Sequence, residues 1–456
     1  MKKFDVIVIG SGGGAKITSP AARLGLKVAV IEKDALGGTC LNRGCIPSKM
    51  LIHPADVAVS IKEASKFDIH IDSRFEVNFS NLIERISATV DHDAQSIEAG
   101  YEKNPNITFY RGCAKFVSDK VISINGEEMT ADKIFIAVGA RPHIPNIPGI
   151  ESVPFMTSTE ALRNKELPKK MIVLGGGYIA VELGHAYGAL GTEVHFLVRS
   201  KLLRKEDGQV SDEFNKVFST IYHVHLGAVP TKITHQGSVF TVFYRDNSGE
   251  KQIQADALLV ATGVIPNTDT LDLRNTNIKT KSGGFIETDG FLKTSVDGVY
   301  ALGDCIGNYL FRHSVNWEGE YLFEEVFGKR TGKPLDYGPV PHAVFSHPQV
   351  AGVGKTEEEL KAEGVDYVVG LNHYKNSAMG MALLSDHGFV KILIERKTRK
   401  ILGAHIIGPE ASNMIHMVIA LIYKHGTLDD LLSMIYIHPA LPEIVRNAAR
   451  KAKAAL

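Results

Sequence analysis

Residues 4–15 read FDVIVIGSGGGA, and residues 171–180 read MIVLGGGYIA. In each stretch a short, continuous run of apolar and β-branched residues leads directly into a glycine-rich turn, and a helical pattern follows. Such a run is typical of a strand that is buried on both faces of a parallel sheet. The turns begin at Gly10 and Gly175, about 165 residues apart, which is far longer than the period of a solenoid repeat. The sequence therefore predicts two α/β domains of similar architecture.

The composition is that of an ordinary globular protein. The chain has 456 residues, enough for two to four domains at about 100–200 residues each. Lys and Arg together number 51, as do Asp and Glu, so the basic excess of a nucleic-acid-binding protein is missing. Apolar runs such as residues 417–423 are well short of the roughly 18 residues that a membrane span needs. The N-terminal residues resemble a buried strand and not a secretory signal, so we expect a cytoplasmic protein with no membrane or nucleic-acid partner.

Proline-rich stretches mark the expected domain boundaries, at residues 141–149 and 333–342. Beyond the second stretch, strand signals mix with helical ones and predict a separate α+β domain. The clearest expected elements are strands at 389–394 and 401–407 and helices at 48–66, 77–104, 357–363 and 411–425.

The first glycine turn matches a dinucleotide-binding pattern. Gly10, Gly12 and Ala15 fit G-x-G-x-x-G/A directly after a strand, and Glu32 ends the next strand. The glycines allow a tight turn and close approach of the backbone to a pyrophosphate, and the N-terminus of the following helix supplies N–H donors. Glu32 can accept hydrogen bonds from a ribose diol. A plain glycine-rich turn is the alternative, but strand, turn, helix and acid together favour a nucleotide site.

The second turn repeats the pattern in Gly175, Gly177 and Ala180. At the end of its next strand stands Arg199, where an acid would favour the free 2′-hydroxyl of NAD, and Arg204 follows. Arginine accommodates the 2′-phosphate of NADP. A solvated basic loop is the alternative. We therefore expect NADPH more than NADH.

Cys40 and Cys45 stand close together in GGTCLNRGCIPSK, residues 37–49, in a chain whose four cysteines are too few for a disulfide scaffold. In a regular helix their Cα atoms would be too far apart for an unstrained disulfide, so we expect Cys40 at a distorted helix start, where the helix dipole lowers a thiol pKa. The spacing is not that of zinc ribbons, and no metal site is predicted. The spacing alone favours two inert thiols, whereas the position after a dinucleotide motif favours a redox-active pair. Cys113 and Cys305 are isolated and are expected in the core.

Taken together, these segments resemble the class I pyridine nucleotide-disulfide oxidoreductases, the family of dihydrolipoyl dehydrogenase, glutathione reductase, mycothione reductase and mercuric reductase. The resemblance covers essentially the whole chain, because IAVGARP, GGGYIAVE, LLVATGVIPNT, TSVDGVYALGDC, AVFSHPQVAGVGKTE and YIHPALPE follow in the family order. It implies an α/β fold with two Rossmann-like dinucleotide-binding domains, for FAD and NAD(P), and a C-terminal α+β dimerisation domain. The implied bounds are 1–145 with 266–335 for the FAD-binding domain, 146–265 for the NAD(P)H-binding domain and 336–456 for the interface of a homodimer.

The resemblance also implies roles for single residues. Cys45 would be the flavin-facing sulfur, and Cys40 the interchange thiol that attacks the substrate disulfide. Lys49 matches a lysine near the flavin and Glu182 its carboxylate partner. Tyr178 matches a gating tyrosine over the nicotinamide pocket, for which core packing is an equal alternative. The implied cofactor-binding residues are Gly10, Gly12, Gly13, Ala15, Glu32, Lys33, Gly38, Thr39, Lys49, Gly139, Asp304 on the flavin side, Gly175, Gly177, Tyr178, Ile179, Arg199, Arg204 and Gly263.

The stretch His438-Pro-Ala-Leu-Pro-Glu443 supplies the last element of the expected site. An imidazole can hold a proton near neutral pH for an exchanging thiol, and the nearby carboxylate can orient the ring. The resemblance implies that this pair reaches the cysteines of the other subunit. Hydride from NADPH or NADH would pass through FAD to the disulfide of Cys40 and Cys45. Cys40 would then form a mixed disulfide with the substrate, and His438 would protonate the leaving thiolate.

The substrate stays open between a dihydrolipoyl group, as in dihydrolipoyl dehydrogenase, and a low-molecular-weight thiol disulfide, as in mycothione or glutathione reductase. HPALPE resembles dihydrolipoyl dehydrogenase and mycothione reductase more than glutathione reductase, and residues 313–320 resemble mycothione reductase most. Arg199 and Arg204 depart from the acid that NAD-dependent dihydrolipoyl dehydrogenases carry. The tail lacks the cysteine pair of mercuric reductases, which disfavours metal-ion reduction. The intact cysteine pair argues against a flavin oxidase and against a non-catalytic flavoprotein subunit.

Overall fold

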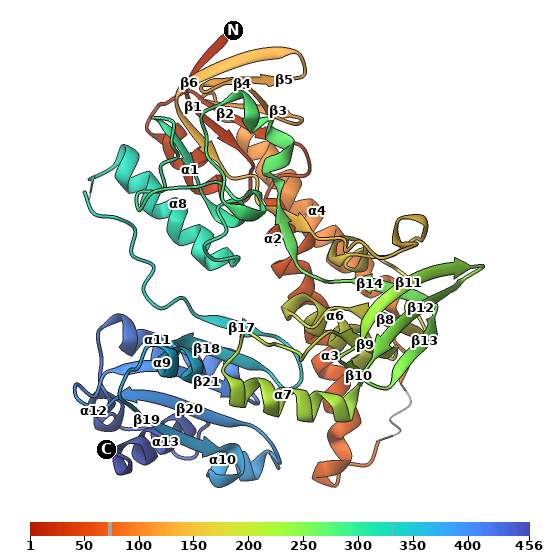
Figure 1. The fold of residues 1–456 in the computed structure, drawn as a ribbon. Helices are drawn as coiled ribbons and strands as arrows, with labels where there is room; N and C mark the ends of the chain where they lie inside the picture. Colours follow the sequence, from red (N-terminus) through yellow and green to blue (C-terminus); the bar gives the residue numbers. More distant parts are fainter. Residues whose placement is uncertain (72–74, 331) are drawn as a thin grey trace. The chain divides into compact units, whose positions relative to one another are not determined.

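The computed structural model of the protein describes residues 1–71, 75–330 and 332–456, which Figure 1 traces from red to blue. The described residues pack into two compact units. Unit 1 comprises residues 1–50, 81–143 and 263–337, and unit 2 comprises residues 51–80, 144–262 and 338–456. Unit 1 overlaps with most of the predicted FAD-binding domain, and unit 2 contains most of the other two predicted domains. The division into three domains stays a prediction.

A seven-stranded sheet forms the centre of unit 1. The strand order is β3-β2-β1-β6-β5-β4, with β16 also pairing with β6. All pairs are parallel except β4 with β5 and β5 with β6. Val6, Ile7 and Val8 of the first strand are completely buried, as a strand covered on both faces requires. The strands are β1 (Lys2–Ile9), β2 (Val28–Glu32), β3 (Ile107–Arg111), β4 (Lys115–Ser118), β5 (Val121–Ile124), β6 (Glu127–Ile136) and β16 (Val299–Ala301).

Helices follow the glycine turn and cover this sheet. Helix α1 (Ala15–Arg23) begins directly after the turn and packs against α8 (Arg312–Phe327) (Figure 1). Two further helices, α2 (Gly38–Arg43) and α3 (Cys45–Glu63), carry the cysteine pair. The long α4 (Phe79–Glu102) and α3 confirm the two helices predicted in this part of the chain.

Unit 2 contains a second parallel sheet, in the order β10-β9-β8-β14. Its strands are β8 (Lys170–Leu174), β9 (Glu193–Val198), β10 (His223–Leu226) and β14 (Ala257–Val260), and its helices are α6 (Tyr178–Ala189) and α7 (Gly208–Ile221). An antiparallel sheet of three strands accompanies it, formed by β11 (Val229–Gln236), β12 (Val239–Asp246) and β13 (Gly249–Ala255). The repeated glycine turn therefore does open a second α/β fold, as predicted.

The C-terminal part of unit 2 is an antiparallel sheet in the order β17-β18-β21-β20-β19. Helix α13 packs on β19 and β20, and α11 packs on β18 and β21. The predicted strands and helices of this α+β region are confirmed. Its elements are β17 (His342–Val344), β18 (Val350–Gly354), α9 (Glu357–Ala362), β19 (Tyr367–His373), α10 (Ala378–Ala382), β20 (Phe389–Glu395), β21 (Ile401–Ile407), α11 (Ala411–Tyr423), α12 (Leu428–Ser433) and α13 (Pro442–Ala454).

Short elements complete the fold. None of the helices in the described part of the chain has the length and the apolar character that crossing a bilayer requires. The remaining elements are β7 (Ala140–Pro142), paired with β15 (Val264–Pro266), helix α5 (Ser158–Ala161), and the 3-10 segments η1 (Ala64–Phe67), η2 (Ile150–Ser152), η3 (Asn267–Leu271), η4 (Leu273–Asn275), η5 (Ser282–Gly284), η6 (Gly303–Cys305) and η7 (Tyr374–Asn376).

Candidate active site

A break between two helices brings the cysteine pair together. Helix α2 ends before Gly44, whose φ of −144° and ψ of −120° are not helical, and α3 begins at Cys45. A Cβ on Gly44 would lie 2.8 Å from the carbonyl oxygen of Thr39, so the turn leaves little space for a side chain. The sequence predicted Cys40 at a distorted helix start, and the structure places it in the first turn of α2, just after Gly37 and Gly38 with φ values of +101° and +68°. The break at Gly44 is a second distortion, which the sequence did not indicate.

The two thiols share a hydrogen bond that makes Cys40 more acidic and Cys45 less acidic. This hydrogen bond lowers the pKa of Cys40 to about 6, outweighing burial, and the positive charges of Arg312 and Lys49 lower it further. The same hydrogen bond raises the pKa of Cys45. The reduced pair therefore holds one proton and one thiolate at neutral pH, and a thiolate is the form that attacks a disulfide.

The arginine that acts on Cys40 is not the one that lies next to it in the sequence. Arg43, between the cysteines, forms an ion pair with Asp34 at 2.6 Å. Arg312, at the start of α8, acts on Cys40 instead, and a Cβ on Gly12 would lie 3.9 Å from its Nη1. No local pattern in the sequence indicated Arg312, because its proximity comes from the packing of α8 on α1.

Glycines form a narrow backbone cradle at the first turn. Gly10 has a φ of +99°, and a Cβ there would lie 2.2 Å from the carbonyl oxygen of Ala137. Gly38 has a φ of +68°, and its Cβ would lie 2.6 Å from the Cα of Gly12. Side chains at these positions would fill the space at the N-terminus of α1, where a pyrophosphate can accept backbone N–H bonds.

Two adjacent glycines serve packing. A Cβ on Gly13 would lie 2.4 Å from Cγ1 of Val315 on α8, and a Cβ on Gly14 would lie 2.2 Å from the carbonyl oxygen of Gly10. Gly14 was not among the predicted residues. The run of three glycines in GSGGGA was the available signal, since the motif itself does not require glycine at that position.

Glu32, at the end of β2, faces the same turn. One carboxylate oxygen accepts the Ser11 N–H at 2.9 Å and the Ser11 hydroxyl at 2.8 Å, and the other accepts the Asp34 N–H at 3.1 Å. The carboxylate is thus held at the carboxyl end of the strand, where a ribose diol would be recognised. Cradle, helix N-terminus and acid together fit the ADP half of a dinucleotide.

Two carboxyl groups, the half-buried Asp304 and the completely buried Glu318, lie at the predicted flavin side of unit 1. Burial raises the pKa of Asp304, in η6, to about 6. Burial also raises the pKa of Glu318, on α8, to about 7, although Glu318 accepts the Gly303 N–H at 2.6 Å and the Tyr337 hydroxyl at 2.7 Å. Glu318 was missed by the sequence reasoning. It shapes the turn that carries Asp304, and a glutamate in a helix gives no sign of such burial.

Other predicted cofactor residues lie around these elements. Lys33 and Thr39 are exposed, on either side of the turn from β2 into α2. Gly139 and Gly263 have φ values of +65° and +120°, and a Cβ on either would meet nothing within 4 Å. Open space at both glycines is compatible with a ligand, and their cofactor role stays a prediction.

The other two cysteines differ from each other. Cys305 is completely buried, as predicted. Cys113 is exposed, so the expectation of a core position for it was wrong. It lies in the connection between β3 and β4, outside the strands whose side chains form the core.

The second glycine turn, in unit 2, repeats the geometry of the first. Gly175 has a φ of +130°, and a Cβ there would lie 2.2 Å from the carbonyl oxygen of Ala261. Space within 4 Å of a Cβ on Gly177 is empty, and α6 begins at the next residue. Ile179, in the first turn of that helix, is 40% exposed. The turn therefore opens to solvent at a helix N-terminus, which suits a pyrophosphate.

The basic residues after β9 have unequal surroundings. Lys201 forms an ion pair with Asp212 at 3.0 Å. Arg199 and Arg204 are exposed, and among the described residues neither has an ion-pair partner. Their guanidinium groups therefore remain available to an anion.

Tyr178, the first residue of α6, is anchored through its hydroxyl. The hydroxyl donates to Glu206, whose other carboxylate oxygen lies 2.7 Å from Nε2 of His342. The tyrosine and His342 rings stack with centroids 6.1 Å apart. Burial raises the pKa of Tyr178, so it is a neutral donor. The sequence indicated Tyr178 but neither partner, since these lie on distant segments.

Lys49 and Glu182 are found in different units. Lys49 lies one turn after Cys45 on α3 and contributes positive charge to Cys40. Glu182, on α6, is 8% exposed and accepts the Phe345 N–H at 3.0 Å. The ion pair between them stays a prediction.

His438 and Glu443 lie within hydrogen-bond distance of each other, and their acid–base role stays a prediction. Nδ1 of His438 lies 3.0 and 3.2 Å from the two carboxylate oxygens. The carboxylate also accepts hydrogen bonds from Nη2 of Arg446 at 2.7 Å and from the Ala440 N–H at 3.3 Å. Burial would raise the pKa of Glu443, but these hydrogen bonds outweigh it and lower the pKa. The side chain of His438 is 71% exposed, so an ionised, buried carboxylate orients a ring whose other nitrogen faces outward.

Known proteins match the chain along nearly its full length. The profile of the pyridine nucleotide-disulphide oxidoreductases matches residues 4–319, and that of their dimerisation domain matches residues 340–449. The chain is 35% identical to mycothione reductase of Mycobacterium tuberculosis, covering 98% of this chain and 99% of the relative. It is 34% identical to the mitochondrial dihydrolipoyl dehydrogenase 2 of Arabidopsis thaliana, covering 98% and 89%.

A solved structure agrees with these matches. The Cu(II) complex of the HOCl-induced flavoprotein disulfide reductase RclA from Escherichia coli aligns with a TM-score of 0.88 and 28% identity, over 99% of each chain. The predicted family and fold are thereby confirmed. The chain belongs to the class I pyridine nucleotide-disulphide oxidoreductases, flavoprotein enzymes that use FAD and NAD(P)H and act on sulfur groups.

Proposed function

We propose that this enzyme is a homodimer that uses NADPH to reduce a small disulfide through Cys40 and Cys45. The main support is the reduced cysteine pair, which holds a single proton beside two cations and so presents a thiolate at neutral pH. An inert pair of core thiols would have no such charge, because burial alone raises a thiol pKa, as it does for Cys305, to about 12.

The chain's own residues supply the thiol chemistry. FAD, when bound, provides the electron pair that opens the disulfide of Cys40 and Cys45. The thiolate of Cys40 attacks one substrate sulfur and bonds to it, and the other substrate sulfur leaves as a thiolate that takes a proton from His438. The neutral His438 then takes the proton of Cys45, whose sulfur attacks that of Cys40. The bond between Cys40 and the substrate breaks, and the second substrate sulfur leaves as a thiolate that takes this proton from His438. Two electrons and two protons have passed to the substrate, and the protein disulfide is closed again.

A second copy of the chain fits the surroundings of His438. Ile435 is 102% exposed and Ile437 is 79% exposed, immediately before the 71% exposed His438 side chain. Large apolar side chains at full exposure commonly mark a protein–protein interface. They lie within the part of the chain that matches the dimerisation domain. We therefore infer that the partner subunit covers these isoleucines and that His438 acts on the partner's cysteine pair.

The choice of NADPH depends on Arg199 and Arg204. Both are exposed just after β9, where a ribose 2′-phosphate would be read. A hydrogen bond to a charged group contributes about 1.5–3 kcal/mol. Arg199→Ala and Arg204→Ala should each raise the KM for NADPH about 10- to 150-fold and leave the KM for NADH nearly unchanged. Arg245→Ala, at an exposed arginine of the same unit, is the matched control. Equal effects on both nucleotides would refute the proposed preference.

The substrate is proposed to be a low-molecular-weight thiol disulfide, as the name of the mycothione reductase relative suggests. A dihydrolipoyl group is the second candidate, favoured by the dihydrolipoyl dehydrogenase relative. A steady-state matrix of NADPH and NADH against lipoamide, glutathione disulfide and mycothiol disulfide separates them. Dominant activity with NADH and lipoamide would refute the proposal in favour of the second candidate.

The role of the cysteines is tested separately. Cys40→Ser and Cys45→Ser should each abolish disulfide turnover while the purified protein keeps its FAD absorbance. Cys113→Ser, at an exposed and isolated thiol, is the control and should keep full activity. Undiminished disulfide reduction in both active-pair variants would rule out the mechanism.

A further inference from the structure

Three histidines and a glutamate gather at the edge of the parallel sheet in unit 2, outside the disulfide chemistry. Glu193 and His195 lie on β9, and His223 and His225 lie on its neighbour β10, the edge strand. His223 pairs in register with His195. Because alternate residues of a strand share a face and paired residues of parallel strands lie side by side, all four side chains project from one face.

Their nitrogen and oxygen atoms are close together. Nε2 of His195 lies 2.6 Å from a carboxylate oxygen of Glu193, and the His195 and His223 rings stack with centroids 4.3 Å apart. One ligand atom each from Glu193, His195 and His223 lies within 4.8 Å of the others. Bonds of about 2.0–2.2 Å to a tetrahedral zinc ion place neighbouring ligands about 3.3–3.6 Å apart, so small side-chain rotations would suffice.

A fourth side chain is placed to orient the central imidazole. Nδ1 of His195 lies 3.2 Å from Nε2 of His225, whose Nδ1 lies 3.4 Å from the hydroxyl of Tyr244. A metal-binding histidine usually hydrogen-bonds through its second ring nitrogen in this way, which sets its tautomer and its direction. The Nε2 of His195 is thereby left to face Glu193.

The charge state of the cluster suits a cation. A carboxylate among imidazoles offers one negative charge and nitrogen lone pairs, which are the ligand types that a divalent transition-metal ion takes. Lys170 opposes a cation, since its Nζ lies 2.9 Å from Glu193, but its side chain is 31% exposed and can turn toward solvent.

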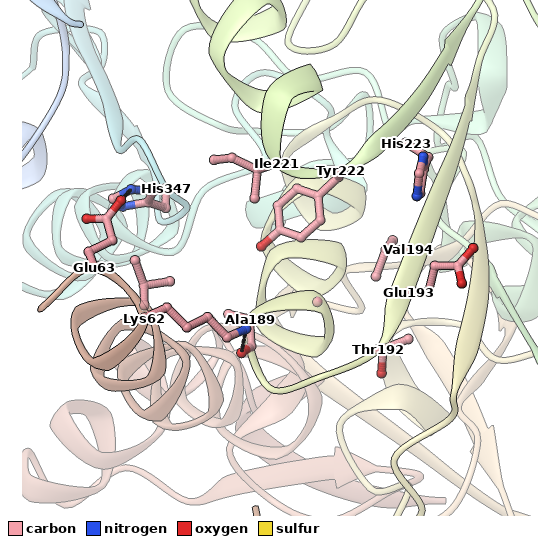
Figure 2. A pocket seen from close by; sticks show the side chains of 12 residues that line it. Lys62, Glu63, Ala189, Thr192, Glu193, Val194, Ile221, Tyr222, His223 and His347 are labelled. Atoms are coloured by element: carbon pink, nitrogen blue, oxygen red, sulfur yellow. Dashed lines mark hydrogen bonds and ion pairs between the residues drawn. The ribbon is translucent and has the colours of Figure 1, made fainter. Parts of the chain in front are cut away.

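More distant charges complete the surroundings. Lys251 and Asp246 both act on His225 with opposite signs and are ion-paired to each other at 2.7 Å, which leaves a small net field. Glu193 and His223 also line a cavity of about 420 Å³, on the side opposite Glu63 and His347 (Figure 2). The cavity gives an ion access and leaves room for a water molecule as a further ligand.

We propose that Glu193, His195 and His223 bind one divalent transition-metal ion, with Zn²⁺ as the representative, and that His225 positions His195. Imidazole and carboxylate ligands suit zinc and its neighbours in the first transition row. The expectation of no metal site rested on the cysteine spacing and on the lack of a second Cys/His cluster in the sequence to accompany it. The sequence did not indicate the histidine cluster, because its members belong to two strands that become neighbours only in the folded protein.

The test uses oxidised holoenzyme, in which the disulfide of Cys40 and Cys45 keeps those sulfurs from the metal. Calorimetric titration with Zn²⁺ should show one site that is weakened at least tenfold by His223→Ala, because one of three ligands is lost. His225→Phe should weaken the same site about tenfold through the lost orientation of His195. His92→Ala, at an exposed histidine of unit 1, is the matched control and should bind like the wild type.

The wild type should also gain thermal stability in Zn²⁺, because the ion would join β9 to β10, whereas His223→Ala should gain none. Since His223 is exposed, its replacement should leave the fold intact, which circular dichroism checks. Wild-type protein that binds no Zn²⁺, or that binds it no more tightly than His223→Ala, would overturn the proposal.

Discussion

Replacing Glu443 by glutamine tests the acid–base pair most directly. The carboxylate is 4% exposed and accepts hydrogen bonds from His438, Arg446 and the Ala440 N–H. The amide keeps the volume of the side chain but removes its charge, and the ring of His438 loses its charged partner. Hydrogen bonds to charged groups contribute about 1.5–3 kcal/mol. Since about 1.36 kcal/mol is a factor of ten in rate, disulfide turnover should fall about 10- to 150-fold.

The loss of activity in Glu443→Gln should be confined to the half of the reaction in which the disulfide substrate is reduced. Reduction of ferricyanide by NADPH needs bound FAD but no proton from His438, so it should keep its wild-type rate in Glu443→Gln. Because Glu443 positions another residue, the fall should appear mainly in kcat for the disulfide. Arg446→Gln is the control: it removes another contact of the same carboxylate, keeps the His438 contact, and should cost less than tenfold.

Two results would refute this reasoning. Disulfide turnover above half of the wild-type rate in Glu443→Gln would mean that the carboxylate does not orient the base. An equal fall in ferricyanide reduction would mean that the substitution disturbs the fold or the cofactor instead.

Three further expectations follow from the geometry. The reduced enzyme should react with iodoacetamide at a rate that rises with pH through about 6, because the thiolate fraction of Cys40 grows above its pKa of about 6; a half-rise near 9 would contradict the shared proton. Lys391→Met should destabilise unit 2 by about 3–5 kcal/mol in urea unfolding, because it leaves the completely buried Asp207 without its cation, and adding Asp207→Asn should recover most of the loss. A double variant no more stable than Lys391→Met would contradict this. Gly38→Ala should yield protein with less than half of the wild-type FAD absorbance, because its Cβ would lie 2.6 Å from the Cα of Gly12; full FAD content would show that the cradle tolerates a side chain.

Much of the fold was predictable because its signals are local. The apolar runs before Gly10 and Gly175 are short-range consequences of burial on both faces of a sheet, and both became central strands. The helix predictions for residues 48–66 and 77–104 also came from local periodicity. The expected core position of Cys113 was wrong because an isolated cysteine carries no local signal of burial.

The break between α2 and α3 was predictable only in part. The sequence indicated that residues 40 and 45 need a distortion to meet, since the spacing of thiols in a helix is known. The expected distortion at Gly37 and Gly38 is present, but the sequence did not indicate the second one at Gly44. A Cβ on Gly44 would lie 2.8 Å from the carbonyl oxygen of Thr39, a contact that arises only in the folded backbone.

Candidate groups whose members are neighbours in the chain could be picked out from the sequence. The glycine turns stood out by their own pattern, whereas the two cysteines and the pair His438 and Glu443 gained their expected roles from the resemblance to the family. Charges and ligands from distant segments became neighbours only on folding. Arg312 beside Cys40, Glu206 beneath Tyr178 and the histidines of β9 and β10 are of this second kind. Electrostatic and coordinating interactions act over a few ångströms, and for residues far apart in the chain that distance is set by how sheets and helices pack.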